Sequence, residues 1–531
     1  MESVIRILKI IFAFLLLILI FGFGFHAGKR YDIALDENDQ YVAISYSVNE
    51  QKMRRLMSLI DNHYVDQIHS DTLFDNTIAY VMSKLDPHSV YLNRQSSGVV
   101  NQEMKGYFVG VGINYVTWRD TLYITSVHPQ SVNRERFITG DRILSINGVD
   151  VTGPSANQAA HLLQGEIDSQ VQITLLRNDE TINTMARRLP ITQNSVSMAY
   201  MLTDQVGYIK LTRFGENSYY EFRTALLTLK NQGMQALVFD LRGNPGGVMK
   251  VAEQIADEFL KENQLIVYTV DKDGKKQMRY ATRRGDFEDN PVYVLIDEGS
   301  ASASEIIAGA LQDNDIGVVI GRRSYGKGLV QRQISLGDGS QLRLTTARYY
   351  TPTGRSIQKP YLVEPKDYSA DIVQRYKRGE MFSRDSIKTV DSLRFVTPGG
   401  KVLYGGGGII PDEFIPIDTI NYGKWFYEHA HNNLFQEKII EHIEENKQNF
   451  NVLTEKHFID YYNVEQFSQQ LLEAAGVPSN RFTELQLQNF NTFVKAELAK
   501  HIYGTAAYDH MWNLRDAMIT RALELYNEEH P

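Results

Sequence analysis

The most constraining feature of the sequence is an alternation of strand-like and helix-like runs that begins at Val206. Short apolar runs bounded by turn residues, which are typical of buried strands, occur in VGYIKLTRF, ALVFDLRGNPGG and PVYVLID. Amphipathic helical patterns follow them in SYYEFRTALLTLK, VMKVAEQIADEFL and SEIIAGALQ. Strands that alternate with helices predict a mixed α/β domain, which we assign to residues 191–417.

The rest of the chain has a different pattern on each side of this domain. Residues 36–97 are predicted to be helical, because apolar side chains recur at helical spacing in NEQKMRRLMSLIDNHYV. Residues 98–190 alternate like paired strands and contain the tight turn Asn147-Gly148, so they predict a compact β-rich module. Residues 418–531 are again helical in pattern. We therefore expect a multidomain α+β protein, in agreement with a length of 531 residues and about 150 residues per domain.

The first 30 residues predict export. Basic residues flank an apolar run, IIFAFLLLILIFGFGF, at positions 10–25. Its sixteen residues are slightly fewer than the roughly 20 that span a bilayer, and snorkelling of Lys9 and Lys29 would make up the difference. A cleaved signal peptide is the alternative. We expect residues 1–30 to be an uncleaved inner-membrane anchor, with the remainder of the chain in the periplasm.

Composition excludes several functional classes. The net charge is −9, whereas a nucleic-acid-binding protein usually carries a basic patch. The chain has no cysteine, which excludes a thiol nucleophile, a disulfide framework and a Cys-ligated metal site. The pair His429-x-His431 has no third ligand nearby in the sequence. We therefore expect no nucleic acid, no metal and no cofactor.

The segment GRRSYGKGLVQ, residues 321–331, first matches the spacing of a phosphate-binding loop. Gly328, however, stands where a Ser or Thr would bind Mg²⁺. The residues after it alternate like a strand, whereas a phosphate-binding loop opens a helix. Nucleotide binding is therefore disfavoured.

Lys327, in the middle of this segment, has a second possible use. Burial lowers the pKa of a lysine, and a neutral lysine can deprotonate a serine without help from a histidine. Gln331 lies four residues further on, on the same face of a predicted strand, and could hold the amine by a hydrogen bond. The alternative is a surface lysine in a hairpin, which is the commoner role of an isolated G-K-G.

Two further segments are suited to a serine-based site. GSASASEIIAGALQD, residues 299–313, joins an apolar strand to a helix, so a hydroxyl there would lie beside helix N-terminal amides. The three candidate nucleophiles are Ser300, Ser302 and Ser304. Ser302 and Glu305 also have the spacing of a structural capping box. LRGNPGG, residues 241–247, could direct a backbone amide at an oxyanion, although a plain turn explains its glycines equally well.

These motifs together resemble those of the carboxy-terminal processing peptidases, also called tail-specific proteases. The similarity rests on GSASASEIIAGALQD, GRRSYGKGLVQ, LRGNPGG and the earlier LDPHSVYL, and it covers residues 45–415. It implies a crotonase-like peptidase core in the mixed α/β domain and a PDZ-like β-rich module before it.

The resemblance also implies roles for single residues. Ser302 would be the nucleophile, Lys327 the base, and Gln331 the residue that orients the lysine. An oxyanion hole would be formed by backbone amides among Ala303, Gly246 and Gly247. Asp313 matches an acidic position that acts in some members of the family.

The β-rich module looks like the PDZ domain of the same family, with VGVGINY as its carboxylate-binding loop and GDRILSINGV as its second signature. An extended C-terminal tail can add to a sheet edge while backbone amides hold its carboxylate. The residues assigned to tail binding are Val109, Gly110, Val111, Gly112 and Ile113. The resemblance further implies that tail binding moves this module and aligns the serine with the lysine.

The sequence thus predicts an extracytoplasmic serine endopeptidase that binds substrate C-termini and hydrolyses peptide bonds with a Ser-Lys dyad. Its partners would be proteins or peptides with free C-termini and the membrane. A second copy of the chain or an adaptor protein could also bind, with residues 418–531 as the surface for self-association. The alternative is a PDZ scaffold whose peptidase core is inactive.

Overall fold

The computed structural model describes residues 31–35, 41–45, 47–282, 285–361, 368, 370–418, 425–426, 433–450 and 452–530. The predicted anchor, His429 and His431 lie outside these residues. None of the described helices is long and apolar enough to cross a membrane. The chain divides into two units, Met1–Lys84 and Leu85–Pro531.

The first unit contains a strand pair and two helices. The antiparallel pair is β1 (Tyr31–Leu35) and β2 (Tyr41–Ser45), and the helices are α2 (Val48–His63) and α3 (Ser70–Met82). The predicted helices are confirmed at α2 and α3. The prediction of helix was wrong at β2, because the β-branched and aromatic residues of YVAIS favour a strand.

In the second unit, the region predicted to be β-rich, residues 98–190, begins within α4 (Arg94–Met104), so the prediction of strands is wrong over 98–104. Its main sheet has the order β10-β9-β7-β6-β5, with β8 on β7, and β4 pairs separately with β11. The bounds are β4 (Tyr107–Gly110), β5 (Ile113–Trp118), β6 (Thr121–Val127), β7 (Arg142–Ile146), β8 (Val149–Asp150), β9 (Gln170–Arg177), β10 (Glu180–Arg187), β11 (Leu189–Thr192) and the helix α5 (Ala159–Leu163). The predicted tight turn is present between β7 and β8, where Asn147 and Gly148 have φ values of 50° and 75°.

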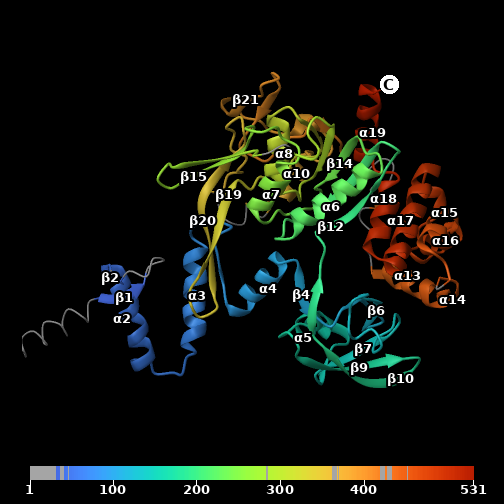
Figure 1. Cartoon of the computed structure of the whole chain (residues 1–531). Coiled ribbons are helices and arrows are strands. Elements are labelled where there is room, and N and C mark those ends of the chain that lie inside the picture. Colours follow the sequence, from blue (N-terminus) through green and yellow to red (C-terminus); the bar gives the residue numbers. More distant parts are fainter. Residues whose placement is uncertain are drawn as a thin grey trace, which may run out of the picture. The chain divides into compact units, whose positions relative to one another are not determined.

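The mixed α/β domain is built on a largely parallel sheet with the order β12-β13-β14-β17-β18-β23. The strands are β12 (Val196–Met201), β13 (Val206–Leu211), β14 (Ala236–Asp240), β17 (Val292–Ile296), β18 (Gly317–Gly321) and β23 (Glu413–Phe414), and β12 is antiparallel to β13. β14 and β17 are buried along their whole length, as expected at the centre of a parallel sheet. The helices α6 (Ser218–Asn231), α7 (Met249–Ala256) and α8 (Ala303–Asp313) share a hydrophobic core with these strands (Figure 1).

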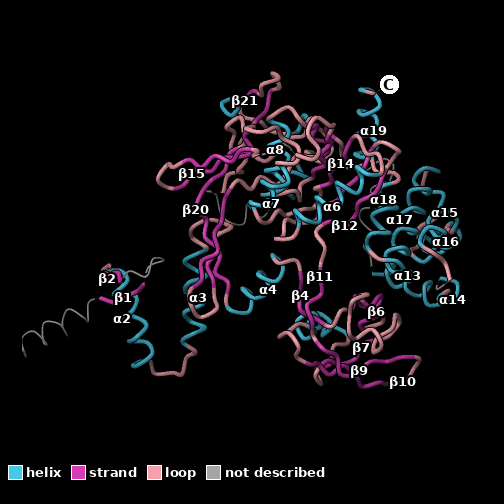
Figure 2. Tube along the Cα trace, in the orientation of Figure 1, coloured by secondary structure: helices cyan, strands magenta, loops and turns pink. Residues whose placement is uncertain are grey.

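A second sheet of the same domain has the order β16-β15-β20-β19, with β3 (Val90–Leu92) paired to β20. Its strands are β15 (Leu265–Asp271), β16 (Lys276–Tyr280), β19 (Leu329–Ser335) and β20 (Gln341–Tyr350). β19 and β20 form an antiparallel pair, and β15 and β20 of this sheet are labelled among the magenta strands of Figure 2. Because β3 lies within residues 36–97, the prediction of helix is also wrong there.

The C-terminal region is helical where it is described, as the sequence predicts. After α10 (Asp371–Lys377), β21 (Arg394–Val396) and β22 (Val402–Tyr404), it contains α13 (Asn433–Glu445), α14 (Lys447–Phe450), α15 (Glu455–Tyr461), α16 (Glu465–Ala474), α17 (Glu484–Tyr503), α18 (Thr505–Asn513) and α19 (Ala517–Glu529). Helices α13 to α18 share their own apolar core. By contrast, α19 packs Met518 and Ile519 against the parallel sheet, with Tyr208, Val238 and Tyr293. The last helix therefore covers the sheet face opposite α6, α7 and α8.

Candidate active site

The three motif segments meet at one edge of the parallel sheet. Residues 241–247 follow β14, residues 297–302 follow β17, and residues 322–327 follow β18. Because these strands are parallel neighbours, their carboxyl ends lie at the same edge. The segments border one cavity of about 720 Å³, which we call the serine–lysine cavity. Its lining includes Ser302, Lys327, Gln331, Gly246 and Gly247.

Ser302 immediately precedes α8 and has a strained backbone, with φ 54° and ψ −110°. A positive φ is uncommon for a residue other than glycine, and such strain is concentrated at functional sites. Ser300 and Ser304 are fully buried, and their hydroxyls donate to the carbonyls of Leu241 and Asn244, each at 2.9 Å. Of the three candidate serines, only Ser302 borders the cavity.

Lys327 reaches the same cavity from the loop before β19. Burial lowers the pKa of its ammonium group, and the charge of Arg343 lowers it further, while Glu305 and Asp86 act in the opposite direction. Within the described residues, its Nζ makes no hydrogen bond or ion pair. A lysine with a lowered pKa and an unpaired amine has the properties required of a base.

Glu305, on the first turn of α8, connects the serine segment to the lysine segment. Its fully buried carboxylate accepts hydrogen bonds from the backbone amides of Ser302 at 2.8 Å, Gly326 at 2.7 Å and Lys327 at 2.9 Å. It also accepts one from the hydroxyl of Ser324. Burial raises the pKa of this carboxyl group, and the hydrogen bonds oppose that shift. The capping-box spacing was visible in the sequence, but the contacts with the lysine segment were not.

Tyr349 makes a second connection that the sequence did not reveal. Its hydroxyl lies 2.8 Å from the carbonyl oxygen of Lys327 and 3.1 Å from that of Ser302, so it can donate to either. The side chain is 1% exposed and lies on β20, far from both segments in the sequence. Tyr349 thereby helps to fix the two backbones relative to each other.

Gln331 lies on the cavity lining, but it does not hold the lysine amine here. Its Nε2 donates to Thr345 Oγ1 at 3.3 Å, on the neighbouring strand β20. Lys327 lies before the first residue of β19 (Leu329–Ser335). The two-residue alternation of a strand therefore does not apply between Lys327 and Gln331, and the shared face expected from the sequence is not formed.

The glycines of LRGNPGG lie directly against the serine segment. A Cβ atom on Gly246 would be 2.8 Å from Ser302 Cβ, and the φ of Gly246 is 97°, so this position requires glycine. The amide of Gly246 donates to Asn244 Oδ1 at 2.9 Å, so it is already occupied. The amides of Gly247 and Ala303 have no acceptor within the described residues. These two amides are the ones available to an oxyanion.

The predicted tail-binding loop also has unpaired amides. Val109 and Gly110 end β4 and Ile113 begins β5, so Val111 and Gly112 form the turn between them. The carbonyl of Val111 accepts hydrogen bonds from the side chains of two later residues, Ser131 at 2.9 Å and Asn133 at 3.0 Å. In the described part of the chain, the amides of Val111 and Gly112 have no acceptor. Consecutive free amides of this kind can capture a terminal carboxylate.

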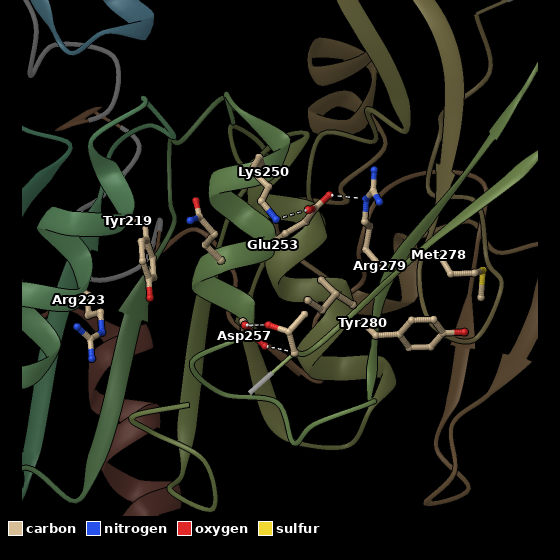
Figure 3. Close-up of a pocket in the computed structure, with 11 residues that line it drawn as sticks. Tyr219, Arg223, Lys250, Glu253, Asp257, Met278, Arg279 and Tyr280 are labelled. Carbon is tan, nitrogen blue, oxygen red and sulfur yellow. Dashed lines mark hydrogen bonds and ion pairs between the residues drawn. The ribbon is translucent and has the colours of Figure 1, made fainter. Parts of the chain in front are cut away.

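A second cavity, of about 530 Å³, lies between α6, α7 and the β15–β16 pair and is drawn in Figure 3. We call it the α6–α7 cavity. Helix α7 contributes Met249 to the serine–lysine cavity and Lys250 and Glu253 to this one. Glu253 is paired with Lys250 at 3.5 Å and with Arg279 at 3.4 Å. Among the described residues, no serine lines this cavity.

Asp313 lies away from the candidate site. It is buried at the end of α8 and forms an ion pair with Arg355 at 2.6 Å, and neither residue lines the serine–lysine cavity. Its place indicates a structural contact. Among the residues that the structure describes, no group of three or more His, Asp or Glu side chains could hold a metal ion.

Comparisons with known proteins place the chain in a class. Residues 205–368 match Peptidase family S41, and residues 109–186 match the PDZ domain. The chain is therefore a serine-type peptidase that carries a PDZ domain.

Individual relatives identify the family. The carboxy-terminal-processing protease of Bartonella bacilliformis is 34% identical over 310 residues, which cover 56% of this chain and 70% of that protein. The carboxy-terminal processing protease CtpB of Bacillus subtilis is 32% identical over 314 residues, which cover 58% of this chain and 65% of that protein. The chain belongs to the carboxy-terminal processing peptidase family, which confirms the resemblance in the sequence. Among solved structures, the photosystem II D1 C-terminal processing protease is 27% identical, with 58% of this chain and 83% of that chain covered and a TM-score of 0.36.

Proposed function

We propose that this chain is an exported endopeptidase that binds the C-terminal tails of its substrates through the PDZ domain and cleaves peptide bonds with Ser302 and Lys327. One observation carries the proposal. Ser302 and Lys327 border the same cavity, next to the unpaired amides of Gly247 and Ala303. A nucleophile, a base and two oxyanion donors are the parts that acyl transfer requires.

The proposed mechanism uses these groups in sequence. Lys327 accepts the proton of Ser302 while the serine oxygen attacks the peptide carbonyl carbon. The amides of Gly247 and Ala303 donate to the oxyanion of the tetrahedral intermediate. The protonated lysine then gives its proton to the leaving amine, and the neutral amine activates a water that hydrolyses the acyl-enzyme. Gln331 borders the cavity and is proposed to orient the lysine once substrate is bound.

Tail binding is proposed at the loop Val109–Ile113. The free amides of Val111 and Gly112 support it, because a backbone amide pair can hold a terminal carboxylate regardless of sequence. The serine–lysine cavity also includes Met104 and Gln193, which flank the strands β4 and β11 of the PDZ region. A tail held by the PDZ domain would therefore be tethered close to the cavity.

Several broader features belong to the same proposal. We propose a crotonase-like core at residues 191–417, a PDZ domain at 98–190 and a helical region at 418–531. Residues 36–97 are proposed as a mainly helical region that also contains the strands β2 and β3. Residues 1–30 are proposed to anchor the chain, with the peptidase on the periplasmic side. Residues 418–531 are proposed to mediate self-association or adaptor binding. The mass of the protein in solution tests this proposal, because self-association gives a multiple of the mass of one chain and a bound adaptor adds its own mass.

The test is proteolysis of an unfolded protein with an apolar C-terminus. Ser302→Ala and Lys327→Ala should each abolish cleavage, while the thermal unfolding midpoint stays close to that of the unaltered protein. Lys250→Ala is the matched control, because Lys250 lies on the other cavity and is 73% exposed. Full activity of either dyad variant contradicts the assignment. Tail binding without cleavage by the unaltered protein supports the inactive scaffold instead.

A further inference from the structure

The serine–lysine cavity is rich in positive charge, although the whole chain has a net charge of −9. Arg213, Lys327 and Arg343 are on its lining, and among the described residues Glu103 is the one carboxylate there. Within the described residues, the side chains of Arg213 and Arg343 make no hydrogen bond or ion pair. A cavity lined by one sign of charge concentrates ligands of the opposite sign.

Arg213 is the most unusual of these side chains. Its Nε and Nη2 are shielded from solvent, and neither has a hydrogen-bond partner in the described part of the chain. Burial lowers the pKa of Arg213, and the charges of Glu221 and Glu103 oppose that shift, but within the described residues neither carboxylate forms an ion pair with it. Glu221 instead accepts hydrogen bonds from the backbone amides of Ser195 and Val196. Shielded donor atoms without an acceptor cost free energy, so these two nitrogens are suited to an acceptor that a ligand supplies.

The position of Arg213 connects it to the reacting centre. The next residue, Phe214, pairs with the glycine segment. Its amide donates to the carbonyl oxygen of Gly246 at 3.0 Å, and its carbonyl oxygen accepts from the amide of Val248 at 2.7 Å. The Phe214 side chain is 1% exposed and packs in the core. Arg213 therefore lies one residue from the backbone that positions the amide of Gly247, on the wall of the cavity.

We infer that Arg213, together with Arg343, forms a carboxylate-binding subsite that selects substrates with an acidic group within a few residues of the cleaved bond. The inference rests on the proposed function and adds a substrate preference to it. The planar guanidinium presents paired N–H donors that match the two oxygens of a carboxylate. A Gln side chain in the substrate has only one acceptor oxygen and no charge, so it cannot replace a Glu side chain there. The carboxylate has two possible sources: an Asp or Glu side chain, or the C-terminus of a tail that enters the cavity itself.

The experiment measures binding separately from cleavage. The full chain with Ser302→Ala is titrated with labelled peptides that share one apolar tail and differ by Glu or Gln at a single internal position. Each peptide is also prepared with an amidated C-terminus. We expect the Glu peptide to bind at least about tenfold more tightly, since a hydrogen-bonded charged group contributes at least that factor. Arg213→Gln should remove this preference, and Arg213→Lys should retain part of it.

The matched control is Arg332→Gln, on the exposed side of β19 and outside the cavity lining, which should keep the full preference. If amidation of the peptide C-terminus removes the affinity that depends on Arg213, and the internal change from Glu to Gln does not, the bound carboxylate is that of the tail. The inference is overturned if the Ser302→Ala chain with Arg213 unchanged binds the Glu peptide, the Gln peptide and their C-terminally amidated versions with equal affinity. The unaltered protein, which retains Ser302, is then tested for cleavage of the same peptides. If the binding preference is present but neither peptide is cleaved, the proposed function is contradicted and the subsite is still supported.

Discussion

The serine–lysine cavity and the α6–α7 cavity share helix α7, yet their charges are satisfied in different ways. In the α6–α7 cavity, Glu253 is paired with two cations that line the same space. In the serine–lysine cavity, Lys327 and two arginines have no side-chain partner within the described residues. Paired charges stabilise a surface, whereas unpaired cations beside a serine are free to act on a substrate. The comparison therefore separates a cavity whose charges are paired from the one that we propose to be reactive.

The largest expected difference between the cavities concerns one glutamate near each of them. Glu305→Gln should lower kcat by about a hundredfold or more, because an amide cannot accept all the hydrogen bonds that the carboxylate accepts, and each is worth ~1.5–3 kcal/mol. Glu253→Gln should change kcat less than about twofold, since its ion pairs are partly exposed. Steady-state proteolysis of one unfolded substrate by both variants measures the contrast. Similar losses in the two variants would remove the distinction between the cavities.

A smaller effect is expected at the tyrosine behind the serine–lysine cavity. Tyr349→Phe keeps the ring in the core but removes the hydroxyl that bonds the carbonyls of Lys327 and Ser302. We expect kcat to fall about tenfold and stability to fall by ~1–2 kcal/mol, because a buried acceptor loses its donor. The two quantities are measured by kinetics and by urea unfolding. A loss of stability with unchanged kcat would show that the hydroxyl does not position the dyad.

The pH dependence of activity tests the pKa of Lys327 and the effect of the nearby Arg343 on it. The pKa of Lys327 is lowered, so kcat/KM should rise with pH and reach its plateau below the usual pKa of a lysine. Arg343 contributes to this lowering by charge repulsion, so Arg343→Gln should raise the pKa and move the rising limb to higher pH. The pH profile of kcat/KM for both proteins measures the shift. A shift to lower pH contradicts the assigned role of Arg343.

The smallest effect is expected at the paired cation of the α6–α7 cavity. Arg279→Gln breaks an ion pair of 3.4 Å whose arginine side chain is 49% exposed. Exposed pairs contribute ~0–1 kcal/mol, so stability should change by less than that and activity by less than about twofold. Thermal unfolding and the same proteolysis assay provide the values. A large loss of activity here would give the α6–α7 cavity a role that its satisfied charges do not predict.

The sequence was sufficient where structure depends on local pattern. The turn before α8 was predicted because an apolar strand, small residues and an amphipathic run are adjacent in the chain. The choice among Ser300, Ser302 and Ser304 required the fold, since two of the hydroxyls bond to carbonyls about sixty residues earlier. Their burial against that segment follows from the pairing of β14 with β17, which no local pattern specifies.

Long-range packing explains what the sequence did not reveal. Tyr349 and Arg213 each look like an ordinary residue of a strand or its end, and only the assembled sheets bring them to the site. The hydrogen bond expected between Gln331 and Lys327 is absent, because Lys327 lies in the loop before β19 and Gln331 donates to Thr345 instead. The last helix, α19, contacts the central sheet through residues whose pattern predicts a helix but not its partner.

Mass mapping of the intact protein after reaction with a fluorophosphonate, which phosphonylates an activated serine, tests directly whether Ser302 is the nucleophile and Lys327 its base. We expect one adduct, on Ser302, that is absent in Ser302→Ala and forms at least about a hundredfold more slowly in Lys327→Ala, because the lysine removes the hydroxyl proton. An adduct on Ser300 or Ser304, or labelling that is unchanged by Lys327→Ala, would contradict this assignment.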